Sequence, residues 1–156
     1  DALPIFAHPD AVIVRTSLIY GLEEMDNGTA WMAAALREGR PVTLFTNQRR
    51  NPVWVETLGA ACLALAERSA SPASACRGVL NVAGRQVMTR AEFGLRMLDW
   101  WGIEERATLL LGSDESGRWP LDCTMDVGRA EGLLPVPLWG VDEVLARAGQ
   151  GDLSPM

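Results

Sequence analysis

Polar side chains follow an apolar run near the start of the chain. Residues 11–14 are Ala-Val-Ile-Val; Arg15, Thr16 and Ser17 come directly after them, and Gly21 ends the stretch. A continuous apolar run is typical of a strand that is buried on both faces of a parallel sheet. Ligands of open α/β sheets bind just beyond the carboxyl ends of the strands. We therefore predict that residues 15–21 form the wall of a ligand site.

The composition limits the chemistry that such a site could perform. The chain has no lysine, because all fourteen basic residues are arginine, so any mechanism that requires a lysine is excluded from this chain. The only histidine is His8, and Cys62, Cys76 and Cys123 form no Cys-x-x-Cys pair, which leaves few ligands for a zinc site of the Cys/His type. We expect the three cysteines to be reduced thiols of a cytoplasmic protein.

Net charge and hydropathy bear on two further classes of protein. A formal charge of −6 disfavours a large nucleic-acid-binding surface. No apolar run approaches the roughly 20 residues that a membrane span needs. At 156 residues, of which 48% are hydrophobic, the chain can form one domain with a substantial core.

The elements that must position the polar residues alternate between strands and helices. Helical periodicity and capping signals predict helices at residues 29–38, 56–68, 90–101, 126–134 and 141–148. Short apolar runs predict strands at residues 11–16, 42–46, 78–84 and 107–111, with a short extended piece near residue 53. This alternation favours the α/β class.

Hydroxyl and carboxylate side chains are predicted to begin three of the helices. Thr29 and Asp126 each precede a helical pattern and can act as N-caps. Thr89 and Glu92 have the T-x-x-E spacing of a capping box, which is the clearest local signal in the sequence.

Apolar residues of the predicted helices indicate where the core lies. Leu58, Cys62 and Leu65 have helical spacing in the second helix, and we interpret Phe93, Met97 and Trp100 of the third as core residues. Trp31 and Trp101 are candidates for a surface that faces a partner, since six tryptophans are many for this length.

The strands are too few and too short for a complete doubly wound domain. Such a domain has five or six strands and a Gly-rich first turn, and the chain contains no G-x-G-x-x-G motif or P-loop. We therefore expect part of an α/β protein. Residues 1–10 are expected to be a connector from a missing N-terminal part, residues 11–148 the folded portion, and residues 149–156 a frayed tail.

Four segments of the sequence, in this order, resemble the C-terminal half of an extended short-chain dehydrogenase/reductase. They are Val14-Arg-Thr-Ser-Leu-Ile-Tyr-Gly21, Thr46-Asn-Gln-Arg-Arg-Asn-Pro-Val-Trp-Val-Glu-Thr-Leu58, Gly78-Val-Leu-Asn-Val-Ala-Gly-Arg-Gln-Val-Met-Thr-Arg-Ala-Glu-Phe93 and Arg118-Trp-Pro-Leu-Asp-Cys-Thr-Met-Asp126. The subgroup that the chain resembles most is the dTDP-4-dehydrorhamnose reductases. The resemblance implies the fold of the C-terminal part of a Rossmann-like, NAD(P)-binding extended short-chain dehydrogenase/reductase that lacks the Gly-rich dinucleotide-binding half. Residues 11–148 would then be its substrate-binding portion.

The resemblance also implies roles for individual residues. Arg15, Thr16 and Ser17 are expected to contact the cofactor, NADP or NAD, which would be bound mainly by the missing N-terminal half. Expected substrate contacts are Leu18, Tyr20, Asn47, Gln48, Arg49, Arg50 and Arg118. The implied ligand is a nucleotide-sugar, and the implied protein partners are the Rossmann half, in cis or in trans, and a second copy in a homodimer.

Simpler interpretations remain open for several of these residues. Hydroxyls at the end of a strand, such as that of Thr16, often bond only to the backbone. The guanidinium groups of Arg49 and Arg50 suit a diphosphate because their donors can bind two oxygens at once, but the pair could equally be solvated. Asn47 and Gln48 could orient a substrate, although we favour a role in forming the turn.

The sequence departs from the family pattern at the catalytic pair and at the sugar contact. The family's Tyr-x-x-x-Lys pair is absent, so no catalytic residue is expected in this chain. Leu18 occupies the position after Arg-Thr-Ser where the reductase subgroup typically has a Trp, and Trp119 separates Arg118 from Pro120. The expected function is the substrate-binding portion of a nucleotide-sugar reductase. The alternatives are a fragment of an epimerase or dehydratase, a non-catalytic regulatory relative, and a free-standing α/β binding module.

Overall fold

The structure is a computed structural model that describes residues 11–69 and 76–153. Its strands are β1 (Val12–Arg15), β2 (Ile19–Tyr20), β3 (Val42–Phe45), β4 (Arg49–Arg50), β5 (Val53–Trp54), β6 (Gly78–Asn81), β7 (Met88–Thr89) and β8 (Leu109–Gly112). Its helices are α2 (Asn27–Arg37), α3 (Val55–Ser69), α4 (Arg90–Trp100), α5 (Gly128–Leu133) and α6 (Val141–Gly149). The predicted α/β class is confirmed. The predicted connector at residues 1–10 and the last three residues of the predicted tail lie outside the described residues.

The described strands pair two by two. Three pairs are parallel, β1 with β6, β2 with β5 and β3 with β8, whereas β4 and β7 are antiparallel. The prediction that β1 is buried on both faces is wrong, because Val12, Ile13 and Val14 are only partly buried and Arg15 is exposed. Within the described residues β6 is the only strand paired with β1, so its other edge has no neighbouring strand to cover it.

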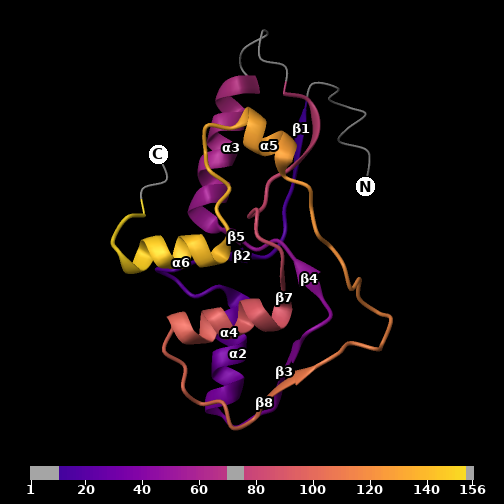
Figure 1. The fold of residues 1–156 in the computed structure, drawn as a ribbon, viewed down its shortest axis with the longest axis vertical. Helices are drawn as coiled ribbons and strands as arrows, with labels where there is room; N and C mark the ends of the chain where they lie inside the picture. The colour runs from indigo at the N-terminus through magenta and orange to yellow at the C-terminus, as the bar shows by residue number, and fades with distance from the viewer. Residues whose placement is uncertain (1–10, 70–75, 154–156) are drawn as a thin grey trace.

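The core consists of three clusters of buried side chains. The helices and strands that carry these clusters follow one another along the long axis of the molecule (Figure 1). One cluster joins α3, β6 and α5 near one end, and another joins α2, β3 and α4 near the other. The middle cluster contains Tyr20, Trp54 and Met97 and packs against α6. Helix α4 contributes to two clusters, with Leu98 in one and Met97 in the other, and both side chains are fully buried.

The helices differ from the sequence predictions mainly at their caps. Asp26, and not Thr29, is the N-cap of α2, because its carboxylate accepts hydrogen bonds from the backbone N–H groups of Gly28 and Thr29. Helix α5 begins at Gly128 with Val127 as its N-cap, although Asp126 still accepts a hydrogen bond from the Gly128 N–H. Both differences are shifts of one to three residues.

The buried face of α3 also differs from the prediction. Cys62 is exposed, and the fully buried positions are Thr57, Ala61 and Leu65, which are spaced four residues apart. The predicted core role of Met97 is confirmed, while Phe93 and Trp100 are partly buried against the same cluster.

Candidate functional site

An open pocket of about 170 Å³ lies between α2, β3 and the first turn of α4. Most of its walls are apolar, with Trp31 and Met32 from α2, Leu44 from β3 and Phe93 from α4. Leu18 and Ile19, which follow the predicted ligand-binding residues 15–17, form another part of the wall. The pocket therefore adjoins the stretch that the sequence singled out, and its apolar walls suit a ring-shaped ligand.

Two polar side chains of the pocket carry charge. Asp26 uses its carboxylate within α2, where it accepts hydrogen bonds from two backbone N–H groups and from the Thr29 hydroxyl. Arg90 is the first residue of α4 and stands at the pocket wall. Since Asp26 is occupied by its helix, Arg90 is the charged group of the wall that could face a ligand.

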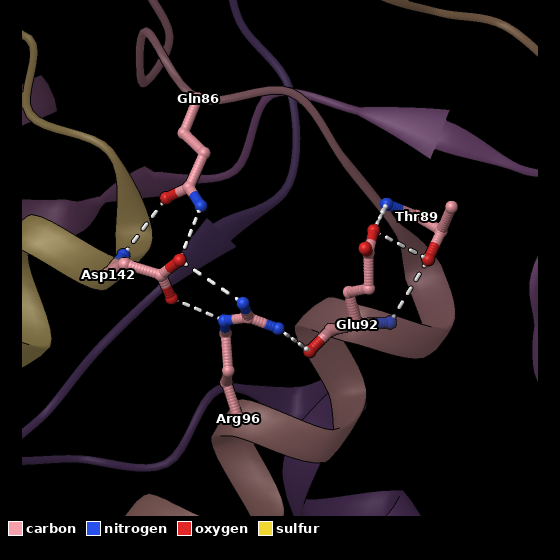
Figure 2. Close-up of polar contacts among 5 residues, drawn as sticks. All are labelled: Gln86, Thr89, Glu92, Arg96 and Asp142. Atoms are coloured by element: carbon pink, nitrogen blue, oxygen red, sulfur yellow. Dashed lines mark hydrogen bonds and ion pairs between the residues drawn. The ribbon is translucent and has the colours of Figure 1, made fainter.

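The start of α4 is fixed by the predicted capping box, which is confirmed (Figure 2). The Glu92 N–H donates to the Thr89 hydroxyl oxygen at 3.1 Å, and the Thr89 N–H donates to the Glu92 carboxylate at 2.7 Å. The hydrogen bond from the Thr89 N–H holds the pKa of Glu92 below its ordinary value. This geometry fixes the first turn of α4, which carries the two pocket residues Arg90 and Phe93.

A second polar network ties α4 to α6 through Asp142. The Asp142 carboxylate accepts hydrogen bonds from the Arg96 guanidinium, one of them at 3.1 Å, and from the Gln86 side-chain amide at 2.6 Å (Figure 2). The Gln86 side-chain oxygen accepts the Asp142 N–H at 2.9 Å. The Arg96 hydrogen bonds lower the pKa of Asp142. Helix α4 is thereby held at its first turn and at its middle.

Arg49 and Arg50 form β4, and the side chain of each contacts the segment at residues 120–122. Arg50 donates hydrogen bonds to the carbonyls of Arg49 at 2.7 Å, Pro120 at 3.0 Å and Leu121 at 3.3 Å. The Arg49 guanidinium is 3.8 Å from the Asp122 carboxylate, and both side chains are more than half exposed. The segment that follows Arg118 therefore runs beside β4.

The neighbouring residues Asn47 and Gln48 hold the loop after β8. The Asn47 side chain donates to the Asp114 carbonyl and accepts the Asp114 N–H at 2.9 Å. Gln48 is fully buried and donates to the Asp114 carboxylate at 2.8 Å. Hydrogen bonds from Ser116 hold the pKa of Asp114 below its ordinary value. The side-chain amides of Asn47 and Gln48 therefore both bond to Asp114, a residue of the same chain.

Tyr20 differs most from its expected role. Its side chain is fully buried, and its ring packs edge-on against Phe93 with the centroids 5.6 Å apart. The hydroxyl has no hydrogen-bond partner among the described residues. Burial, with a further effect of Asp142, raises the pKa of Tyr20 well above its ordinary value. The phenol ring of Tyr20 thus belongs to the core, and its contact with a substrate stays a prediction.

The stretch after β1 retains groups that could contact a ligand. Arg15 is exposed at the end of β1, where it pairs in register with Asn81 of β6. Thr16 and Ser17 are partly buried, and the Thr16 hydroxyl oxygen is shielded from solvent without a hydrogen-bond partner in the described part of the chain. The side chain of Arg118 is exposed, and its backbone N–H donates to Ser116.

Arg90 is the residue that the sequence analysis missed. Its N–H donates to the Gln48 carbonyl at 2.8 Å, which extends the β4–β7 ladder by one position. Partial burial of the guanidinium and the proximity of Arg50 lower the pKa of Arg90. The available signal was the position of an arginine directly after a capping Thr, but the sequence does not reveal that β4 and β7 pair.

Among the described residues, no group of three or more His, Cys, Asp and Glu side chains could hold a metal ion. No helix within residues 11–69 and 76–153 combines the length and hydropathy needed to cross a membrane.

Comparisons with known proteins identify relatives of the chain. A family described as the RmlD substrate binding domain matches residues 5–118. A curated protein of Haloferax volcanii, named as a probable low-salt glycan biosynthesis reductase, is 29% identical over 136 residues, which cover 81% of this chain and 43% of that protein.

Solved structures show the same fold. The dTDP-4-dehydrorhamnose reductase of Bacillus anthracis, in complex with NADP, has a TM-score of 0.67 at 20% identity, covering 90% of this chain and 48% of that one. The UDP-glucuronic acid 4-epimerase of Bacillus cereus, in complex with UDP-glucuronic acid and NAD, has a TM-score of 0.66 at 19% identity, covering 90% of this chain and 46% of that one. The chain thus spans less than half the length of each of these three proteins.

Proposed function

The chain belongs to the RmlD substrate binding domain family, and from that premise we propose that it forms the substrate-binding half of an NAD(P)-dependent nucleotide-sugar reductase. The observation that carries this proposal is the pocket between α2 and α4, whose largely apolar wall includes the guanidinium-bearing residue Arg90. A nucleotide-sugar needs both kinds of surface, one for its rings and one for its diphosphate.

We assign the diphosphate to the arginines of β4. Arg50 is anchored by three backbone carbonyls, which fixes its guanidinium, and Arg49 lies beside it with an exposed side chain. A fixed guanidinium fork binds phosphate oxygens with little loss of side-chain entropy. Arg118 is exposed on the loop that leads to the segment beside β4 and could add a further contact.

We assign the nicotinamide end of the cofactor to the stretch after β1. When bound, NADP or NAD would supply or accept the hydride. The solvent-shielded Thr16 hydroxyl lacks a partner among the described residues, so it fits a hydrogen bond to the cofactor or to a sugar hydroxyl. Arg15 and Ser17 flank it, and Leu18 joins this stretch to the pocket.

The proton donor of the reaction is assigned to another part of the enzyme, in cis or in trans. Tyr20 is the only tyrosine in the chain; it is buried in the core, and its raised pKa disfavours loss of its proton. The chain has no lysine that could lower the pKa of a tyrosine. The Rossmann half would therefore provide the catalytic acid and most of the cofactor contacts. A homodimer and a cytoplasmic location stay predictions.

The test uses the intact protein with NADPH and dTDP-4-dehydrorhamnose, and follows the loss of NADPH absorbance. The proposal expects consumption of NADPH that depends on the sugar, and a large rise in KM for Arg50→Met. Arg37→Met is the matched control, because Arg37 is exposed at the end of α2 and does not line the pocket. Absence of sugar-dependent NADPH consumption by the unmodified protein would refute the reductase assignment.

An epimerase is the second candidate. Leu18, which lines the pocket, stands where the reductase subgroup typically has a Trp, and this difference favours another sugar. An epimerase returns the hydride to the same sugar, so it converts UDP-glucuronic acid without net consumption of NAD. Sugar conversion without a change in cofactor redox state would favour the epimerase, whereas binding without conversion would indicate a non-catalytic relative.

A further inference from the structure

We propose that Arg90 is a second diphosphate-binding arginine, which acts with Arg50 on a ligand whose uncharged ring enters the pocket between α2 and α4. This inference rests on the proposed function, since it assigns a new residue to the same nucleotide-sugar site. It makes Arg90 a determinant of specificity for nucleoside diphosphates over uncharged nucleosides.

The register of the β4–β7 pair places the two arginines on one face. Arg49 lies opposite Thr89 and Arg50 opposite Met88, and the Arg90 N–H donates to the Gln48 carbonyl at the next position. Side chains alternate between faces along a strand. Arg90, the first residue of α4, continues this ladder and is a diagonal neighbour of Arg50, and the two charges are close enough to interact.

Neither guanidinium is neutralised by an ion pair with a carboxylate in the described part of the chain. Arg50 donates only to backbone carbonyls, and Arg90 donates to the Gln48 side-chain oxygen at a long 3.4 Å. The Asp122 carboxylate forms an ion pair with Arg49 and also interacts electrostatically with Arg50, without a hydrogen bond to it. Arg50 and Arg90 are neighbouring cations that repel each other, and the pKa of Arg90 is lowered first by burial and then by the charge of Arg50. A bound phosphate would relieve this repulsion.

The surroundings hold Arg90 in position for such a ligand. Its backbone follows Thr89 of the capping box, and its side-chain partner Gln48 is held in turn by the Asp114 carboxylate at 2.8 Å. The backbone of Arg90 is thus fixed while its guanidinium has only one weak contact to give up. The backbone position of Arg90 is therefore set, while its guanidinium is available to an anionic ligand.

The pocket defines what the rest of the ligand must be. Trp31, Met32 and Phe93 give it apolar walls, and its volume of about 170 Å³ suits a single ring system. The Asp26 carboxylate is used in capping α2, so Arg90 is the charged residue of the pocket wall that remains for a ligand. A phosphate attached to a ring in the pocket would lie next to Arg90. The chemistry points to the nucleoside diphosphate portion of the ligand.

The test is calorimetric titration of the intact protein with dTDP, UDP, thymidine and uridine. Arg90→Met is compared with the unmodified protein, with Arg90→Lys, which keeps the charge, and with Arg37→Met, which removes an exposed charge outside the pocket. We expect Arg90→Met to weaken diphosphate binding about 10-fold or more, while the affinity for the matching nucleoside changes less than about 2-fold. Arg90→Lys should recover part of the loss, and Arg37→Met should change neither affinity.

The outcomes separate this inference from the proposed function. Unchanged diphosphate affinity in Arg90→Met, or an equal loss of nucleoside binding, would overturn the role of Arg90 and leave the reductase proposal standing. Failure of the unmodified protein to bind either diphosphate would overturn the anion site itself. Arg90-dependent binding in a protein that converts no nucleotide-sugar would support the site and refute the reductase.

Discussion

Gly84 offers the sharpest test of the packing that holds β4 and the pocket in place. A Cβ atom added there would lie 2.2 Å from the Pro52 carbonyl oxygen and 3.0 Å from the Trp139 carbonyl oxygen. Both atoms belong to the backbone, so neither can rotate away as the end of a flexible side chain could. Gly84 is not among the glycines with positive φ, so alanine could adopt its backbone conformation and the expected cost is steric.

Two opposing contributions determine how much Gly84→Ala changes the free energy of unfolding. Overpacking of a tight interior typically costs about 1–3 kcal/mol, and two fixed oxygens place Gly84→Ala at the upper end of that range. Replacing glycine also reduces the entropy of the unfolded chain, which returns about 0.4–1 kcal/mol. We therefore expect the free energy of unfolding to fall by about 2 kcal/mol. Since Pro52 must move and Arg50 lies two residues before it, affinity for dTDP should fall as well.

The assay is urea unfolding followed by circular dichroism, with Gly59→Ala as the control. Gly59 is exposed within α3, and no atom outside its own helix turn lies within 4 Å of the added Cβ. The same chemical change should there stabilise the protein by up to about 1 kcal/mol, because alanine favours the helix. If Gly84→Ala changed the free energy of unfolding by less than about 0.5 kcal/mol while Gly59→Ala was stabilising, the argument from close packing would be refuted.

Three further predictions concern polar contacts. Thr89→Ala removes the acceptor of the Glu92 N–H and should lower the free energy of unfolding by about 1 kcal/mol in thermal or urea melts, whereas Thr89→Ser should be nearly neutral. Asn51 is 1% exposed and bonds one backbone carbonyl and one backbone N–H, so Asn51→Ala should cost about 3 kcal/mol in the same measurement; a loss below about 1 kcal/mol would contradict this role. Asp142 has a lowered pKa in the folded state, so the stability it gains from Arg96 is present above the ordinary pKa of a carboxylate and is lost as the pH falls through the lowered value. Asp142→Asn should therefore be less stable than the unmodified protein at pH 7. The difference should begin to shrink as the pH falls below about 4 and disappear once the pH is below the lowered pKa of Asp142, whereas a difference that stays constant through this acid titration would exclude the carboxylate charge as its source.

The sequence predicted the longer elements because their signals are local. The helical periodicity of α3 and α4 and the capping box at Thr89 each act within one or two turns, and the structure confirms both helices and the capping box, although Cys62 of α3 is exposed. The cap of α2 was assigned to Thr29 because both Asp26 and Thr29 can accept a backbone N–H. The structure shows Asp26 in that role, with the Thr29 hydroxyl donating to it.

The site was harder to predict because it depends on contacts distant in sequence. β4 and β7 have two residues each, and only their mutual pairing brings Gln48 opposite Arg90. Tyr20 follows polar residues at a strand end, which is a pattern typical of a binding site, yet packing by α4 and α6 buries its ring. The family resemblance predicts roles for residues 15–18 and for the arginines of β4, whereas Arg90 becomes a candidate only through the pairing of β4 with β7.

The separation of the core into three clusters predicts which parts of the molecule unfold together in local unfolding. The middle cluster shares α4 with the cluster of α2 and β3, so these two should lose their hydrogen-exchange protection together. The cluster of α3, β6 and α5 contains no residue of α4. Its amides, including those of β1 and β6, can exchange through a separate local opening that leaves the pocket and the arginines of β4 intact. The protein would then behave as two cooperative folding units, with the ligand stabilising one of them more than the other.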